Sequence, residues 1–124
     1  VNDLMITGDR MPVVSDSESF MSVINTISEF KLGMAMIVDN KGHLIGVLTD
    51  GDIRRTIIKH QNSSVLSVKD VMTVNPKRIT EEAYAASALN LMEKYSITAL
   101  AVVDSDNIPV GVIHVHDLLR AGVA

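Results

Sequence analysis

Two acidic residues at matching places in this 124-residue chain have the chemistry to bind the polar groups of a small ligand. Asp52 follows Thr49 by three residues, where an apolar run gives way to a predicted helix. A carboxylate at such a place can accept hydrogen bonds from two vicinal hydroxyls, and the free N–H groups of a helix start can hold a phosphate. Asp117 follows His114 at the same spacing, and there an imidazole stands where the first position has a threonine. An imidazole can donate a hydrogen bond to a phosphate or a carboxylate.

Thr49 and Asp52 also have a purely structural interpretation, because threonine and aspartate are common helix N-caps. In that interpretation the two residues stabilise the helix that follows them. In the ligand interpretation the Thr49 hydroxyl is free at the strand end. The two roles are compatible, and both stay open at this point.

Three arginines are the cations nearest to these positions in the sequence, namely Arg10, Arg54 and Arg55. A guanidinium can form paired hydrogen bonds with a phosphate or a carboxylate. We predict that Arg10 and one residue of the 54–55 pair, taken here as Arg55, contact the ligand. The alternative for each arginine is a solvated side chain or an ion pair with a nearby aspartate.

The same residues give no support for catalysis or for metal binding. The chain has no cysteine, which excludes disulfides, thiolate metal sites and a cysteine nucleophile. It has no Ser-His-Asp set with a supporting context and no glycine-rich phosphate loop. His114 and His116 would share one face of a strand, but they have no fixed third ligand. We therefore predict no catalytic residues and no metal site.

Composition excludes two further classes of function. The formal net charge is −4 and the isoelectric point is about 5.4, whereas a nucleic-acid surface needs clustered lysine and arginine. No apolar stretch approaches the roughly 18–20 residues that span a bilayer, and no signal-peptide pattern opens the chain. We expect a cytoplasmic protein. Because the chain starts with valine, we also expect that another segment precedes it in the natural protein.

The chain repeats itself once. Residues 38–39, 46–48 and 52–55 recur 65 positions later, and residues 1–5 resemble residues 68–72 at an offset of 67. Two copies that fill a chain suggest two halves that pair through their apolar faces. We predict a first repeat at 1–60, a linker at 61–67 and a second repeat at 68–124, related by a pseudo-twofold axis.

Each half shows the same order of predicted elements, β-α-β-β-α, so the fold class is α/β (α+β). In the first half, a capping-box pattern at 15–18 predicts a helix start, and apolar residues at helical spacing follow through Ile27. Strands are predicted at 12–14, 34–38 and 44–49, with a helix at 50–59. In the second half we predict a helix that starts near Thr80. Strands are predicted at 78–79, 99–103 and 110–114, and a helix closes the chain.

The order of elements, with a strand that ends in Gly-Val-Leu-Thr and an aspartate three residues later, resembles the CBS domain. Two such domains in tandem form a Bateman module, and the resemblance covers the whole chain. Residues 4–5, 7–12, 48–55 and 114–122 further resemble the C-terminal region of bacterial arabinose-5-phosphate isomerases, which begin the pathway to the sugar KDO. In that family an N-terminal sugar-isomerase (SIS) domain carries the catalysis, and this chain lacks it.

The resemblance implies a ligand and a regulatory role. CBS pairs typically hold a nucleotide between the two repeats, so Thr49 and Asp52 would be the intact ribose and phosphate pair. His114 departs from the usual serine or threonine, while Asp117 is kept, which puts the second site in doubt for adenosine. The chain would need no cofactor. Its effector would be a nucleotide or nucleotide sugar such as CMP-KDO, AMP or ATP, which would control the attached SIS domain in a homo-dimer or tetramer.

Two other functions compete with feedback control of an isomerase. The pair could be a ligand-free oligomerisation module, which a degenerate second motif would suit. It could also be an AMP or ATP sensor on another enzyme. Direct catalysis by this chain has no support in its residues.

Overall fold

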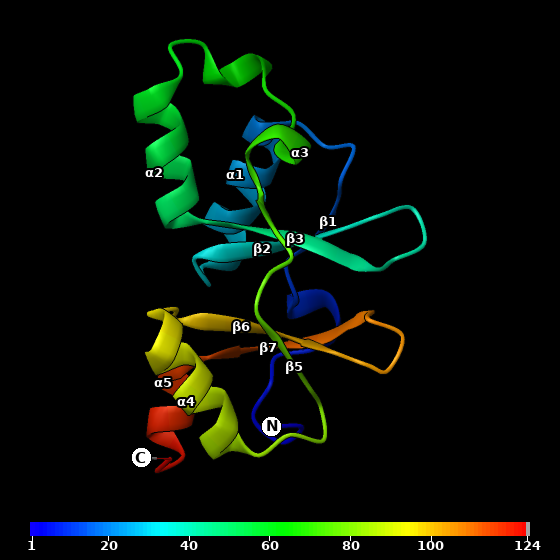
Figure 1. Cartoon of the computed structure of the whole chain (residues 1–124), viewed down its shortest axis with the longest axis vertical. Helices are drawn as coiled ribbons and strands as arrows, with labels where there is room; N and C mark the ends of the chain where they lie inside the picture. The colour runs from blue at the N-terminus through cyan, green and yellow to red at the C-terminus, as the bar shows by residue number, and fades with distance from the viewer. Residues whose placement is uncertain (124) are drawn as a thin grey trace. The chain divides into compact units, whose positions relative to one another are not determined.

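The computed structural model describes residues 1 to 123, which form two compact units (Figure 1). The first-repeat unit is Pro12–Pro76. The second-repeat unit combines Val1–Met11 with the residues from Lys77 onward.

The first-repeat unit is a four-stranded sheet with helices packed against it. Its strand order is β1-β2-β3-β4, with β1 parallel to β2 and the other neighbours antiparallel. Helices α1 and α2 lie on the same side of this sheet (Figure 1). The elements are β1 (Val13–Ser15), α1 (Phe20–Phe30), β2 (Met34–Val38), β3 (Leu44–Thr49), α2 (Asp50–Lys59), the 3-10 turn η2 (Ser63–Val65), α3 (Val68–Val71) and β4 (Thr73–Val74).

The second-repeat unit has a three-stranded sheet in the order β5-β6-β7, with β5 parallel to β6 and β6 antiparallel to β7. Its elements are the 3-10 turn η1 (Gly8–Arg10), β5 (Arg78–Thr80), α4 (Ala85–Tyr95), β6 (Ala99–Val103), β7 (Pro109–His114) and α5 (Val115–Arg120). From β5 through the start of α5, every element starts 65 residues after its counterpart. The predicted mixed α/β class and the β-α-β-β-α order are confirmed. The pseudo-twofold axis stays a prediction.

The core of each unit contains the apolar helix face that the spacing of its hydrophobic residues predicted. In the first-repeat unit, Phe20, Val23 and Ile27 of α1 are buried against β2 and Leu48. In the second, Ala88, Leu89 and Met92 of α4 are buried against β6 and β7. Burying a side chain the size of valine or phenylalanine contributes about 1.5–3 kcal/mol. These two faces therefore hold each helix against its sheet and fix where the strand ends lie.

The first helix starts later than its capping-box pattern predicted. Ser15 belongs to β1, and the Glu18 carboxylate that accepts from its N–H at 3.3 Å closes a turn. The N-cap is Ser19, whose hydroxyl accepts from the Ser22 N–H at 3.1 Å, and α1 begins at Phe20. The predicted start at Ser15 is wrong because that residue is held extended by pairing with β2.

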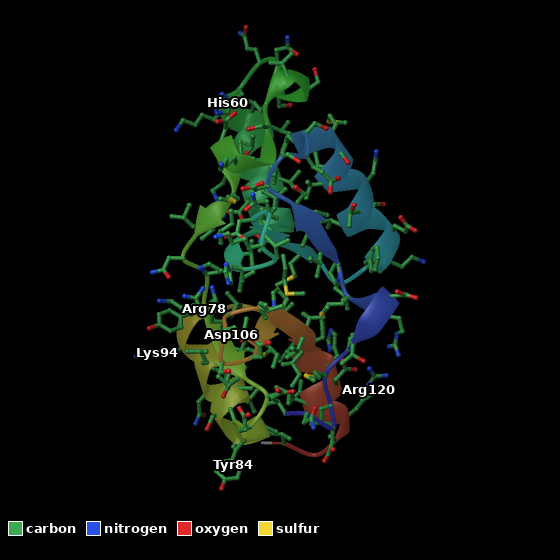
Figure 2. All side chains as sticks on the ribbon, turned by 90° about the vertical axis from the view of Figure 1, so that its right-hand side faces the viewer. His60, Arg78, Tyr84, Lys94, Asp106 and Arg120 are labelled. Carbon is green, nitrogen blue, oxygen red and sulfur yellow. The ribbon has the colours of Figure 1, made fainter. Side chains whose placement is uncertain are left out.

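The second helix start is displaced in the same way. Thr80 ends β5 and pairs with Val103 of β6, so its backbone is extended. Helix α4 begins at Ala85, and its N-cap is Tyr84, which makes no side-chain cap bond. Tyr84 is 81% exposed and projects from the chain (Figure 2). The prediction of a start near Thr80 is wrong for the same reason as in the first repeat.

The N-terminal segment of each repeat packs on the sheet of the other repeat, and we call these two stretches, residues 1–11 and 68–76, the crossover segments. Within the second-repeat unit, Ile6 exchanges backbone hydrogen bonds with Val112 of β7, at 2.8 and 3.0 Å. Within the first-repeat unit, Thr73 pairs with Val47 of β3. The compact units therefore divide at residues 11 and 76, whereas the repetition of the sequence divides the chain at 60 and 68. This crossover is why the two divisions differ.

None of the helices within residues 1 to 123 is long and apolar enough to cross a membrane.

Candidate functional site at the two strand-to-helix junctions

The first junction joins β3 to α2 and contains the Thr49 and Asp52 pair. Thr49 is the N-cap of α2, and its hydroxyl accepts from the Asp52 N–H at 3.2 Å. In return, the Asp52 carboxylate accepts from the Thr49 N–H at 3.0 Å, which completes a capping box. The helix-cap interpretation is therefore confirmed at this junction.

The Thr49 hydroxyl is not free, contrary to the expectation from the sequence. Besides accepting from the helix N–H, it donates to Oδ2 of Asp52 at 3.0 Å. Its one proton and one of its two lone pairs are in use, so one acceptor position remains. A ligand can use Thr49 only through that position or by displacing Asp52.

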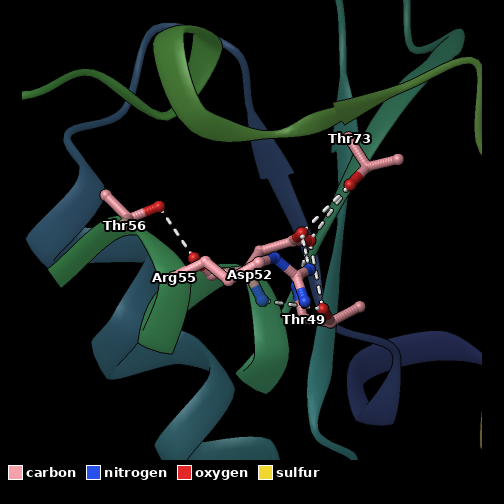
Figure 3. A network of polar contacts seen from close by, with 5 residues as sticks. All are labelled: Thr49, Asp52, Arg55, Thr56 and Thr73. Atoms are coloured by element: carbon pink, nitrogen blue, oxygen red, sulfur yellow. Dashed lines mark hydrogen bonds and ion pairs between the residues drawn. The ribbon is translucent and has the colours of Figure 1, made fainter. Parts of the chain in front are cut away.

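The Asp52 carboxylate is the centre of a larger network that includes a residue the sequence did not indicate (Figure 3). Arg55 donates to Oδ1 at 2.7 Å. The hydroxyl of Thr73, on β4, lies 3.1 Å from Oδ1 and 3.2 Å from Oδ2. The Asp52 side chain is only 9% exposed, so these donors replace most of its water. A buried carboxylate is tolerated because it is hydrogen-bonded on every side.

The second junction joins β7 to α5 and is capped by an imidazole. His114 is the N-cap of α5, and its Nδ1 accepts from the His116 N–H at 3.2 Å. The two imidazole rings stack with their centroids 4.8 Å apart and an interplanar angle of 24°. The two histidines do not share a strand as predicted, because α5 begins at Val115 and contains His116. Within residues 1 to 123, no three His, Cys, Asp or Glu side chains gather to hold a metal.

Asp117 is much less engaged than its counterpart Asp52. Within the described residues its carboxylate accepts only from Arg120, the counterpart of Arg55. The Asp117 side chain is 24% exposed, against 9% for Asp52. The position that corresponds to Thr73 is occupied by Ile6, which has no hydroxyl. The second carboxylate therefore has open acceptor positions and the first has few.

The arginines predicted to contact a ligand are placed differently from one another. Arg55 lies on the Asp52 carboxylate, with its own side chain 73% exposed. Arg54 is exposed on α2. Arg10 ends η1 in the second-repeat unit and is exposed as well. The structure thus brings Thr49, Asp52 and Arg55 together in one unit, and His114 and Asp117 in the other.

The hydrogen bond to Nδ1 fixes the chemical form of His114. A ring nitrogen that accepts carries no proton, so the neutral ring holds its proton on Nε2 and presents one N–H donor. Burial lowers the pKa of His114, the nearby His116 and Arg120 lower it further, and Asp117 opposes them. Protonation would place a second N–H where the cap bond needs an acceptor.

We expect this cap to make the chain less stable in mild acid. A histidine whose pKa is lowered on folding contributes stability that is complete above its ordinary pKa of about 6.5 and is lost as the pH falls below it. The urea concentration at the midpoint of unfolding should therefore be lower at about pH 5 than at pH 7.5. His114→Asn keeps an N-cap that does not titrate, so it should flatten this pH dependence. An equal slope in the variant and the unmodified chain would contradict this role.

The comparisons with known proteins place the whole chain among CBS-domain proteins. The CBS domain model matches residues 1–59 and 68–124. Arabinose 5-phosphate isomerase KdsD of Escherichia coli K12 is 42% identical over 99% of this chain, and KdsD of Pseudomonas aeruginosa is 41% identical over 99%. The chain spans only 37% and 38% of their lengths. CBSX2 of Arabidopsis thaliana, solved in complex with AMP, has a TM-score of 0.85 at 25% identity, covering 98% of this chain and 93% of that one.

Proposed function

The chain belongs to the CBS-domain family, and from this premise we propose that it is a regulatory module that binds a nucleotide-type ligand and controls an attached enzyme. The observation that carries the proposal is the duplicated junction. Each copy places an aspartate three residues beyond the N-cap of a helix, beside an arginine. Carboxylate and guanidinium suit the hydroxyls and the phosphate of one nucleotide. The proposed ligand residues are those predicted from the sequence: Arg10, Thr49, Asp52, Arg55, His114 and Asp117.

The attached enzyme proposed here is an arabinose-5-phosphate isomerase. The KdsD relatives are about 2.6 to 2.7 times as long as this chain, so the isomerase chemistry is assigned to an N-terminal SIS domain outside it. Control of that domain requires a ligand that prefers one of its states over another. The oligomeric state, a homo-dimer or tetramer, and the cytoplasmic location stay predictions.

CMP-KDO is the proposed effector within this class of ligand. It combines a ribose, a phosphate and a carboxylate, and as an end product it would give feedback control. The second junction offers donors for acid groups, namely the Nε2–H of His114 and the exposed guanidinium of Arg120. A junction that presents an imidazole donor in place of a hydroxyl suits a ligand with an additional anionic group.

Two other functions are each favoured by one observation. AMP is bound by CBSX2, which supports an adenosine-nucleotide sensor. The acceptor positions of the Asp52 carboxylate are occupied by donors of the chain itself. This supports a ligand-free oligomerisation module, because such a carboxylate stabilises the fold without a ligand. These alternatives differ in what they predict for ligand binding.

A thermal-shift screen of the chain with CMP-KDO, CMP, AMP and ATP tests the proposal. Free ligand at ten times its Kd should stabilise the fold by about 1.4 kcal/mol, a shift of several degrees in Tm. A shift with CMP-KDO alone supports feedback control, and a shift with AMP or ATP alone supports the adenosine sensor. If no ligand shifts the Tm while light scattering shows a defined oligomer, the regulatory proposal is wrong and the assembly module stands.

A further inference from the structure

We infer that Thr73 is a specificity-determining residue that closes the first junction, because its hydroxyl competes with ligand hydroxyls for the Asp52 carboxylate. This inference rests on the proposed function and adds a residue that restricts ligand binding at the first of the two junctions. A ligand that binds Asp52 must first displace a donor that already occupies it, and the Thr73 hydroxyl is one of these donors. The first junction is thus occupied by the chain's own residues when no ligand is present.

The count of donors around Asp52 carries the inference. A carboxylate has about four lone-pair positions. Here the donors are the Thr49 N–H, the Thr49 hydroxyl, the Arg55 guanidinium and the Thr73 hydroxyl. Four donors fill the four positions, and the Thr73 proton is shared between both oxygens. A further hydroxyl finds no acceptor until one of these donors leaves.

The four donors differ in how easily they can leave. The Thr49 N–H donates within the capping box of α2, and the Thr49 hydroxyl is held in place by accepting from the Asp52 N–H in the same box, so removing these two donors would disturb the helix start. Arg55 is 73% exposed, and Thr73 is an exposed residue near the edge of the sheet, so both can turn to water. A vicinal diol brings two hydroxyl donors, the same number that Arg55 and Thr73 supply. Exchange of these two donors for a ribose leaves the cap intact.

The second junction provides an internal comparison. The register of the crossover segments places Ile6 beside Val112 as Thr73 lies beside Val47. An isoleucine cannot donate, and Asp117 keeps its open positions. Both junctions therefore have an aspartate beside an arginine, but only the first junction has the competing hydroxyl.

Calorimetric titration with AMP and 2′-deoxy-AMP tests the inference. Asp117→Asn serves as the background, so that only the first junction has its carboxylate. In that background Thr73→Val should bind AMP roughly two- to tenfold more tightly, the net effect of one hydrogen bond. The gain should be smaller for 2′-deoxy-AMP, which lacks one hydroxyl of the diol. Thr80→Val, a change at an exposed strand residue of the other unit, is the matched control and should leave the Kd unchanged.

The outcomes separate this inference from the proposed function. Equal or weaker AMP binding by a folded Thr73→Val variant overturns the role of Thr73 and leaves the regulatory module standing. Absence of AMP binding with and without Thr73→Val overturns the role of Thr73 for ribose ligands. The thermal-shift screen then decides the proposed function independently. A double-mutant cycle of Thr73→Val with Asp52→Asn in urea unfolding adds a readout that needs no ligand, and additive effects would also overturn the inference.

Discussion

Gly46→Ala is expected to lower the free energy of unfolding by about 2–3 kcal/mol, the upper part of the range for overpacking. A Cβ at Gly46 would lie 2.5 Å from Sδ of Met72 and 3.0 Å from the carbonyl oxygen of Thr73. The methionine can move, but the carbonyl belongs to β4, which pairs with β3 at this point. The alanine therefore pushes the crossover segment off its sheet. Urea unfolding measures the loss.

Two variants check the cause of that loss. A Cβ at Gly51, near the start of α2, would lie 3.3 Å from the flexible end of Arg55 and 3.7 Å from Oγ1 of Thr49, an ordinary contact, so Gly51→Ala should be neutral or stabilising by up to about 1 kcal/mol. Met72→Ala should cost less in the Gly46→Ala background than in the unmodified chain, because it removes the sulfur contact as well as the packing of Met72 on the core. If Gly46→Ala costs no more than Gly51→Ala, the close packing of β4 on β3 is contradicted.

Gly111→Ala is expected to lower the free energy of unfolding in the same way, because Gly111 is the counterpart of Gly46 in the second-repeat unit. A Cβ at Gly111 would lie 2.5 Å from Sδ of Met5 and 3.1 Å from the carbonyl oxygen of Ile6. Both units thus seat a methionine from a crossover segment on a strand glycine. The absence of a side chain is required at these two glycines because another backbone approaches closely.

Asp52→Ala is expected to cost about 2–3 kcal/mol, because it removes the capping box and leaves several donors without their acceptor. Loss of a cap costs roughly 0.5–2 kcal/mol, and a buried unsatisfied donor costs roughly 1–3 kcal/mol. Part of that cost is avoided because Arg55 and Thr73 can turn to water. Urea unfolding and hydrogen exchange of the β4 amides measure the effect.

Asp117→Ala is the matched control for Asp52→Ala. Its carboxylate accepts only from the exposed Arg120 among the described residues, so its loss should cost less than about 1 kcal/mol. Equal costs at the two positions would show that the network around Asp52 adds no stability, and the structural asymmetry between the junctions would be wrong.

The repeat and the two junctions were predictable from the sequence because they are encoded locally. Helical spacing of apolar residues showed the buried faces of α1 and α4. The 65-residue offset placed Asp52 and Asp117 at equivalent helix starts. Such features need only neighbours in the sequence, so the pattern of residue types is sufficient to find them.

The parts that were not predicted depend on contacts between distant residues. Thr73 lies 21 residues from Asp52, and only the pairing of β4 with β3 brings the two together. The sequence did contain a sign of this difference between the junctions, since Thr73 and Ile6 occupy matching positions of the repeat and only Thr73 has a hydroxyl. The helix starts at 15–18 and near Thr80 failed because strand pairing overrode a local capping pattern.

The central claim is that a nucleotide-type ligand binds at the junctions, and an amide NMR titration of the labelled chain with CMP-KDO and with AMP tests it most directly. We predict that one of the two ligands shifts the amides of residues 49–55 or 114–120 in a saturable way. The remaining amides should move much less. Shifts confined to other surfaces, or no shifts with either ligand at millimolar concentration, would contradict the claim.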